Sequence, residues 1–280
     1  MGAITMHELP LVFFTVLMQA VAGSFILLWL IKLIPAAQLQ TSDQQFSLAI
    51  FSLWPLLALA GLAALTHLGQ PLRALNVLFG LKHLSPMSLE IVMVLIFSLL
   101  GLSTSFLLLK KVKGAPLLLC AVLAALAAIG VLFAIANVYF LPTVSLWSTP
   151  WTVINFVFSG ILSGSLLSAL LLYAFRNRNG SSTSFIYIMK PIWGAVLFLF
   201  ILFSCGYLFA LNGEVSAIPV WLKAIQVIRI LLLASAFLCC LLMNLSTQIT
   251  GKLAAVTTAV IIAELLGRVF FYELILLQQL

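Results

Sequence analysis

The sequence predicts an all-α integral membrane protein with eight transmembrane helices in an antiparallel bundle. Of its 280 residues, 64% are hydrophobic and only 7% are charged, whereas soluble domains are nearer half apolar and a quarter charged. The mean hydropathy is +1.29. The apolar residues form continuous segments and do not alternate at every second position, which disfavours a membrane β-barrel.

Eight apolar segments are long enough to cross a bilayer, since each crossing needs about 20 residues. The links between them are short, so we expect neighbouring helices to pack antiparallel in one polytopic domain over residues 1–280. The expected spans are 9–34, 46–67, 89–109, 115–139, 150–175, 185–211, 219–243 and 253–277.

The basic residues predict which way the bundle faces. Eight lie in the links after the first, third, fifth and seventh spans or in the span ends that border these links, namely Lys32, Lys110, Lys111, Lys113, Arg176, Arg178, Lys190 and Lys252. Three lie on the other side, namely Arg73, Lys82 and Lys223. Because Lys and Arg concentrate in cytoplasmic links, we expect both termini outside the cytoplasm. The net charge of +7 is therefore assigned to topology and not to nucleic-acid binding.

Small residues recur on one face of the fifth span, at Ser159, Gly160, Ser163 and Gly164. Such spacing lets two backbones approach closely, so we interpret this face as a packing seam. The aromatic residues Tyr139, Trp147 and Trp151 flank the preceding link and are expected at the membrane interface.

Three ionisable residues fall well inside predicted spans: Arg229, Glu264 and Arg268. A charge in the bilayer is costly unless it is paired or hydrated, so each is a functional hypothesis. Glu264 and Arg268 are four residues apart and share a helix face. Two interpretations stay open, a structural clamp between the seventh and eighth spans or a functional cluster.

The segment from Thr66 to Glu90 is the densest polar passage between two apolar segments. Pro71 should end one helix near His67, and Ser85 before Pro86 should cap the next. A quinol that is oxidised loses two protons with two electrons, so its site needs a base and hydrogen-bond partners. Glu90 and His67 are the candidate proton acceptors. The alternatives are an interfacial histidine and a carboxylate that only complements the helix dipole.

We expect neither a metal nor a bound cofactor in this protein. Its histidines, His7, His67 and His83, are too few within spans for a bis-histidine haem, and its four cysteines form no iron–sulfur motif. If the protein handles electrons, another subunit must receive them.

Four stretches carry a family resemblance. They are M-H-E-L-P-L-V-F-F-T at 6–15, H-L-G-Q-P-L-R-A-L-N at 67–76, S-L-E at 88–90 and E-L-L-G-R-V-F-F-Y at 264–272. Together they resemble the membrane-anchor subunit of bacterial dimethyl sulfoxide reductase. The motifs also recur loosely in polysulfide-reductase-like and nitrite-reductase-like quinol anchors, so an anchor of that kind stays an alternative.

The resemblance implies a heterotrimer in the bacterial inner membrane. A molybdopterin subunit would reduce the acceptor, an iron–sulfur subunit would carry electrons, and this protein would bind and oxidise menaquinol. By position, the quinol-binding residues of the family fall on His67 and Glu90, with Arg73 and Asn76 in the same motif. The anchor itself would not reduce the terminal acceptor.

Two rival functions remain on the residues alone. A secondary transporter could use Arg229, Glu264 and Arg268, but we find no convincing internal repeat, and the prolines cluster near helix ends. A purely structural anchor could use its polar residues only to dock partners.

Overall fold

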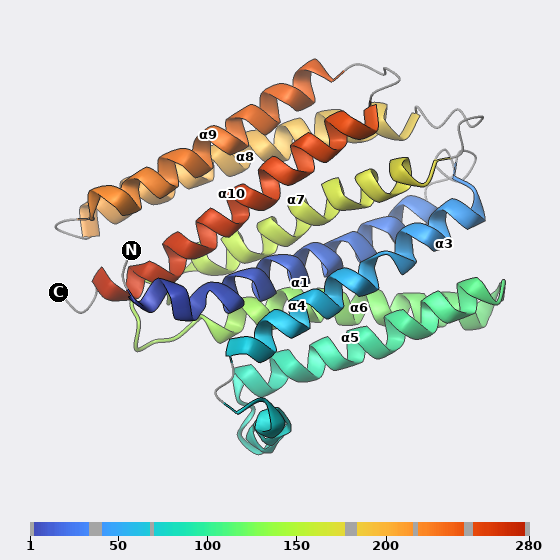
Figure 1. Ribbon diagram of the computed structural model, residues 1–280, viewed down its shortest axis with the longest axis horizontal. Coiled ribbons are helices and arrows are strands. Elements are labelled where there is room, and N and C mark those ends of the chain that lie inside the picture. The colour runs from blue at the N-terminus through green and yellow to red at the C-terminus, as the bar shows by residue number, and fades with distance from the viewer. Residues whose placement is uncertain are drawn as a thin grey trace.

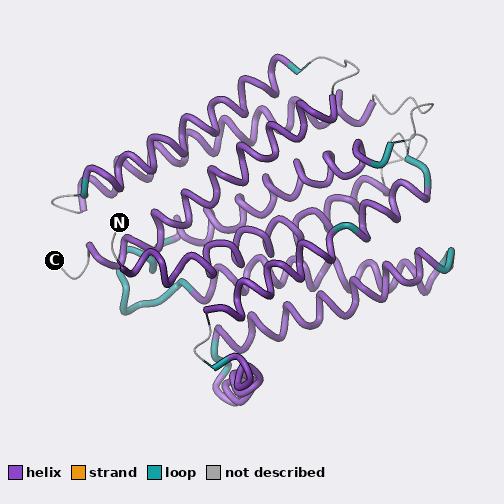
Figure 2. Tube along the Cα trace, viewed as in Figure 1, coloured by secondary structure: helices purple, strands orange, loops and turns teal. Residues whose placement is uncertain are grey.

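The computed structural model describes residues 3–33, 41–67, 70–176, 184–214, 218–243 and 249–277. Its elements are α1 (Ala3–Leu33), α3 (Asp43–Phe51), α4 (Leu53–His67), the 3₁₀ helix η1 (Pro71–His83), α5 (Pro86–Leu109), α6 (Ala115–Val138), α7 (Pro150–Ala174), α8 (Ser184–Glu214), α9 (Val220–Leu242) and α10 (Ile249–Leu277). Figure 2 shows that helices make up nearly all of the described residues.

Within the described ranges, eight segments are long and apolar enough to cross a membrane, which confirms the predicted number. Their bounds are 8–33, 43–67, 86–109, 115–138, 150–174, 188–211, 220–242 and 249–275. The fold class is therefore all-α and membrane-spanning.

The second span is broken, where the sequence predicts one uninterrupted helix. It consists of α3 and α4, which meet at Ser52. The Ser52 hydroxyl donates to the Leu48 carbonyl at 2.8 Å, a back-bond that bends helices. Pro55 follows within one turn, and its ring prevents the preceding backbone from continuing an ordinary helix.

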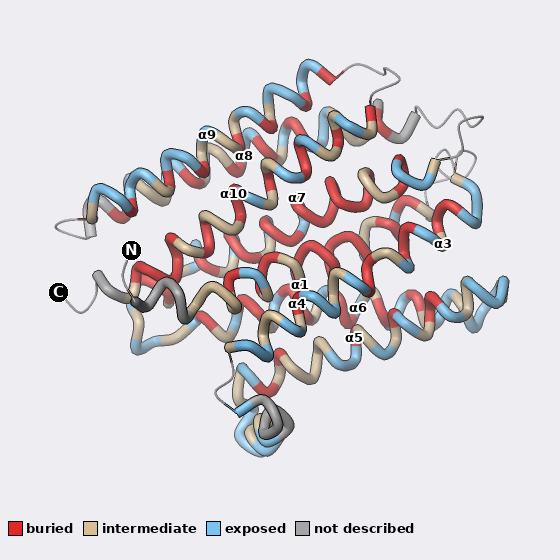
Figure 3. Tube along the Cα trace, in the orientation of Figure 1, coloured by how far each residue is buried: buried red, intermediate tan, exposed pale blue. Residues whose placement is uncertain are grey.

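Helices α1 and α7 form the centre of the bundle (Figure 1), and they are its most buried spans (Figure 3). The small-residue face of α7 packs against Gly23 of α1. A Cβ atom on Gly23 would overlap the Gly160 carbonyl oxygen, and one on Gly164 would lie 2.6 Å from the Gly23 Cα. Ser24 also donates to the Gly164 carbonyl at 2.9 Å. The predicted packing seam is confirmed.

Helices α8, α9 and α10 flank this centre on one side, and α5 and α6 flank it on the other (Figure 1). The described ends of α1 and α10 lie at the same end of the bundle, where η1 also protrudes below α5. The fold thus collects the end of α4, the start of α5 and the end of α6 near one membrane surface.

An aromatic cluster closes this end of the bundle. Tyr139 packs against Phe156 and Tyr272, with ring centroids 5.2 and 5.3 Å apart. Trp147 stacks on Phe271 at 5.0 Å and donates its indole N–H to the Phe271 carbonyl at 2.9 Å. Tyr139 and Trp147 are buried by neighbouring helices. Their predicted place at the membrane interface stays a prediction.

Candidate functional site

The Thr66–Glu90 segment contains a helix where the sequence predicts only a short link. Helix α4 ends at His67 as predicted, but η1 then runs from Pro71 to His83 before α5 begins at Pro86. The Ser88 hydroxyl at the start of α5 donates to the Val77 carbonyl of η1 at 2.6 Å. Gly80 permits this approach, since a Cβ there would overlap the Ser88 oxygen. The 3₁₀ helix therefore packs closely against the first turn of α5 and is hydrogen-bonded to it.

The start of α5 lacks the expected side-chain cap. Ser85 occupies the N-cap position and Pro86 the first turn, but the Ser85 hydroxyl makes no capping hydrogen bond. The turn is instead closed through the backbone, where the Ser85 N–H donates to the Gly80 carbonyl at 3.1 Å. Leu84 reaches this geometry with a positive φ of 50°.

The four predicted quinol-binding residues occupy different environments. Glu90 is buried in α5, with 7% of its surface exposed. His67 is half-buried at the last residue of α4, and Asn76 is exposed on η1. Arg73 belongs to η1, but its side chain lies outside the described part of the structure. The residues share one end of the bundle, and η1 lies between His67 and Glu90 in the sequence.

Glu90 carries a polar atom without a partner. Among the described residues, none forms a hydrogen bond with its buried Oε1 atom. A buried polar atom in this state is costly, and it marks a position where a ligand or water can bind. Glu90 is therefore the predicted residue whose surroundings point most directly to a binding site.

Two tyrosines that the sequence pattern did not single out as site residues lie near Glu90. Tyr139 and Tyr272 both interact electrostatically with its carboxyl group. The Tyr272 hydroxyl donates to the Tyr139 hydroxyl at 2.5 Å. Tyr272 had a signal in the sequence, since it follows Arg268 by four residues and so shares its helix face. For Tyr139 the only signal was its position beside a link, which suggested the membrane interface.

The intramembrane charges form a buried network between α1, α7, α9 and α10. Glu264 lies 3.5 Å from Arg229 of the neighbouring helix, and both side chains are 2% exposed. Arg229 also donates to the Asn155 carboxamide at 3.0 Å. Gly267 makes room for this arginine, because a Cβ there would lie 2.6 Å from its Nε atom.

Arg268 has different partners. It donates to the Gln19 carboxamide on α1 and lies over the Phe156 ring, 3.3 Å from the centroid. Between the described residues Glu264 and Arg268 there is no direct ion pair, although they share a helix face. The network thus joins four helices. Glu264 pairs with Arg229 on the neighbouring helix α9 and not with Arg268 on its own helix.

A groove opens between α5, α6 and α7, and Leu89 and Met93, the α5 neighbours of Glu90, are among its lining residues. It has a volume of about 350 Å³. Its lining includes Leu89, Met93, Phe133, Ala134, Asn137 and Val153. The groove is large enough for an organic ring, because small-molecule sites usually occupy roughly 300–1,000 Å³.

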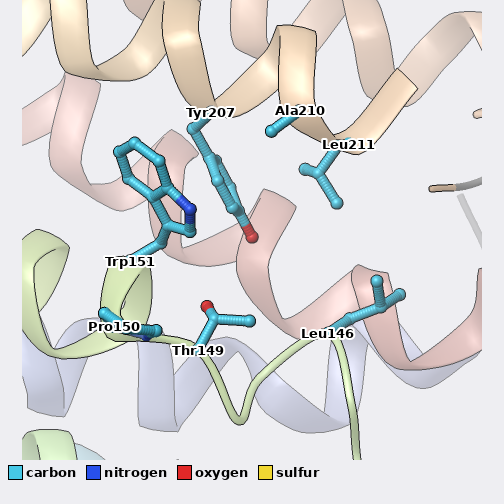
Figure 4. Close-up of a pocket in the computed structure, with 7 residues that line it drawn as sticks. All are labelled: Leu146, Thr149, Pro150, Trp151, Tyr207, Ala210 and Leu211. Atoms are coloured by element: carbon cyan, nitrogen blue, oxygen red, sulfur yellow. The ribbon is translucent and has the colours of Figure 1, made fainter. Parts of the chain in front are cut away.

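A second, smaller hollow of about 140 Å³ lies where α7 begins and α8 ends. In Figure 4 the rings of Trp151 and Tyr207 lie side by side, and the hydroxyls of Thr149 and Tyr207 point toward the hollow. Its volume is below the usual range for a ligand site of roughly 300–1,000 Å³, so we assign no ligand to it.

The residues of the described ranges include no group of three or more His, Cys, Asp or Glu side chains that could hold a metal ion. The chemistry that the described site residues offer is hydrogen bonding and proton transfer through Glu90 and its neighbours.

Comparison with known proteins shows the family. Residues 1–274 match the family described as DMSO reductase anchor subunit (DmsC). The protein belongs to this family. It is 30% identical to the anaerobic dimethyl sulfoxide reductase subunit YnfH of Escherichia coli over 96% of its own length and 95% of that relative. It is 37% identical to the C subunit of anaerobic dimethyl sulfoxide reductase of the same organism over 59% of its own length and 58% of that relative.

A third relative, the C subunit of anaerobic dimethyl sulfoxide reductase of Haemophilus influenzae, is 29% identical over 62% of this protein and 61% of its own length. Membership of the anchor family, together with the eight candidate spans, places the protein in the bacterial inner membrane as a multi-pass protein. The predicted resemblance to dimethyl sulfoxide reductase anchors is confirmed.

Proposed function

We propose that this anchor subunit binds menaquinol and oxidises it beside Glu90, within a dimethyl sulfoxide reductase-type complex. The observation that carries the proposal is the buried Glu90 carboxyl group, whose Oε1 atom has no hydrogen-bond partner among the described residues. Its neighbours on α5, Leu89 and Met93, line a groove. A carboxylate oxygen in this position can accept a hydrogen bond from a quinol hydroxyl.

Each quinol yields one quinone, two electrons and two protons. An iron–sulfur subunit would receive the electrons, and a molybdopterin subunit would use them to reduce the acceptor. The protons pass to Glu90 and His67 and then to water at the near membrane surface. Glu90 and His67 supply the proton-accepting groups, and Arg73 and Asn76 belong to the same proposed site.

The family assignment supports the partners. The relatives are named as parts of anaerobic dimethyl sulfoxide reductases, which favours an anchor in a heterotrimer over a solitary transporter. The buried pairing of Arg229 with Glu264 also fits a structural role for the charge network.

The proposed topology is an antiparallel bundle with both termini outside the cytoplasm. The eight-to-three distribution of basic residues supports it. The described ends of α1 and α10 lie together, as an even number of spans requires. The quinol site would then face the outer half of the membrane.

The test compares two electron donors in the assembled complex. Glu90→Gln should abolish reduction driven by menaquinol and leave reduction driven by reduced viologen, which feeds the partner subunits directly. Loss of both activities would assign Glu90 to assembly alone.

A further inference from the structure

The groove between α5, α6 and α7 contains a polar side chain that the sequence motifs do not include. Among its lining residues Leu89, Met93, Phe133, Ala134 and Val153 are apolar, whereas Asn137 carries a carboxamide. Asn137 is exposed, and no hydrogen bond within the described residues engages its side chain. A carboxamide at one end of an apolar groove can orient a ring that carries oxygen.

We propose that this groove holds the quinol ring and that Asn137 binds one of its two oxygens while Glu90 binds the other. This inference rests on the proposed function, because it assumes that Glu90 acts on a quinol. Beyond the proposed function, it specifies where the quinol ring binds. It also names a binding residue, Asn137 on α6, that lies outside the Thr66–Glu90 segment.

Glu90 adjoins the groove on the surface of α5, although it is not one of the residues that line it. Leu89 and Met93 are four residues apart and line the groove from one helix face. Glu90 is three residues before Met93 and therefore neighbours it on the helix surface. The carboxyl group is more than nine-tenths buried and has an unpartnered oxygen. A ring that passes the adaptable Met93 side chain from the groove would bring a hydroxyl to this oxygen.

Asn137 is suited to both forms of the ligand. Its carbonyl oxygen can accept from the hydroxyl of a quinol, and its NH₂ group can donate to the carbonyl of a quinone. Substrate and product can therefore use the same side chain without a change of protonation. Glu90 accepts as a carboxylate and can donate once it has taken a quinol proton. Because Asn137 takes up no proton, the proton of the hydroxyl that it binds passes to water and on to His67.

The lining favours an aromatic ring that arrives from the lipid. Phe133 lines the groove and is 53% exposed. Met93 lies over Gly130, where a Cβ atom would be 2.9 Å from the Met93 sulfur. A methionine side chain adapts its shape and makes favourable contacts with aromatic rings. The isoprenoid tail of the quinol would stay in the bilayer.

A phospholipid acyl chain is the rival occupant. It would fill the same apolar volume but would form no hydrogen bond with the Asn137 carboxamide. Removal of the carboxamide should therefore weaken binding of a quinol but not binding of an acyl chain.

The experiment uses the complete complex in membranes with a short-chain naphthoquinol as donor. Asn137→Leu should raise the KM for the naphthoquinol about five- to tenfold, as expected for one lost hydrogen bond of roughly 1 kcal/mol. Asn137→Gln should restore much of the affinity. Ala134→Phe, which fills the groove, should raise the KM further. Ala58→Phe on the exposed face of α4 is the matched control and should behave as wild type.

Reduced viologen serves as the assembly control for every variant, and a photoreactive azidonaphthoquinone gives a direct readout. The label should attach near Met93 or Phe133. Unchanged KM values in both Asn137→Leu and Ala134→Phe, or labelling confined to other helices, would overturn the inference. If Glu90→Gln still loses quinol turnover in that case, the proposed function stands without the groove. If Glu90→Gln keeps quinol turnover, the proposed function itself fails.

Discussion

Arg229 and Glu264 form a buried ion pair between α9 and α10. The Arg229 Nη2 and Glu264 Oε1 atoms are 3.5 Å apart, and each side chain is 2% exposed. The arginine also donates a hydrogen bond to Asn155, and the absence of a side chain at Gly267 leaves room for it. Removing one member of such a pair leaves an uncompensated charge inside the bundle.

Glu264→Gln should therefore reduce assembly of the complex. Breaking a buried pair costs about 3–5 kcal/mol, most of it from the charge left behind. The measurement is the amount of assembled complex in membranes and its unfolding temperature in detergent. The double variant Arg229→Gln/Glu264→Gln should recover part of the loss, because the Arg229 charge is removed together with its partner. Normal assembly with lost quinol turnover in Glu264→Gln would instead place Glu264 in the proton-handling site.

The tyrosine pair near Glu90 predicts a coupling between two hydroxyls. Tyr272→Phe leaves the buried Tyr139 hydroxyl without its donor, which should cost about 1–3 kcal/mol. The double variant Tyr139→Phe/Tyr272→Phe should cost less than the sum of the single variants. A double-mutant cycle on detergent unfolding measures this coupling. Strict additivity would show that the hydroxyl contact contributes nothing to stability.

The seam between α1 and α7 predicts a strong size dependence. Gly23→Val should prevent stable assembly, because even a Cβ atom would overlap the Gly160 carbonyl oxygen. Overpacking of a tight interface costs about 1–3 kcal/mol and often more. Gly206→Val on α8 is the control, since a Cβ there meets no atom within 4 Å. The yield of folded protein in membranes separates the two, and equal yields would contradict the seam.

The distribution of basic residues predicts the location of the C-terminus. Alkaline phosphatase fused after Leu280 should be active, because this enzyme folds only outside the cytoplasm. A cytoplasmic reporter at the same point should be silent. The reverse pattern would move the Glu90 site to the cytoplasmic face.

Hydropathy was sufficient to predict the eight spans, since continuous apolar length is the property that a bilayer selects. It gave no sign of the break at Ser52, which depends on one hydroxyl back-bond and the following Pro55. It also missed η1, whose mixed polar and apolar residues resemble a link. The existence of the spans could thus be predicted from composition, whereas local breaks required hydrogen-bond geometry.

The candidate site was only partly accessible from sequence. A charged residue within an apolar span can be recognised from the sequence alone, so Glu264 could be proposed as a structural or functional residue. Its partner could not be chosen, because spacing on one helix favoured Arg268 and the structure pairs Glu264 with Arg229. Tyr139 was assigned to the membrane interface, and its burial depends on contacts with α7 and α10 that are distant in sequence. Such tertiary neighbours leave no periodic signal in a single sequence.

Two electron donors compared on one Glu90→Gln complex test quinol oxidation at Glu90 most directly. Menaquinol-driven reduction should be lost, because the carboxamide cannot accept the quinol proton, while viologen-driven reduction should stay at the wild-type rate. Asp43→Asn, which removes an exposed carboxylate at the far end of the bundle, should leave both activities intact. Full menaquinol turnover in Glu90→Gln would contradict the proposal, and equal loss with both donors would show that Glu90 serves assembly only.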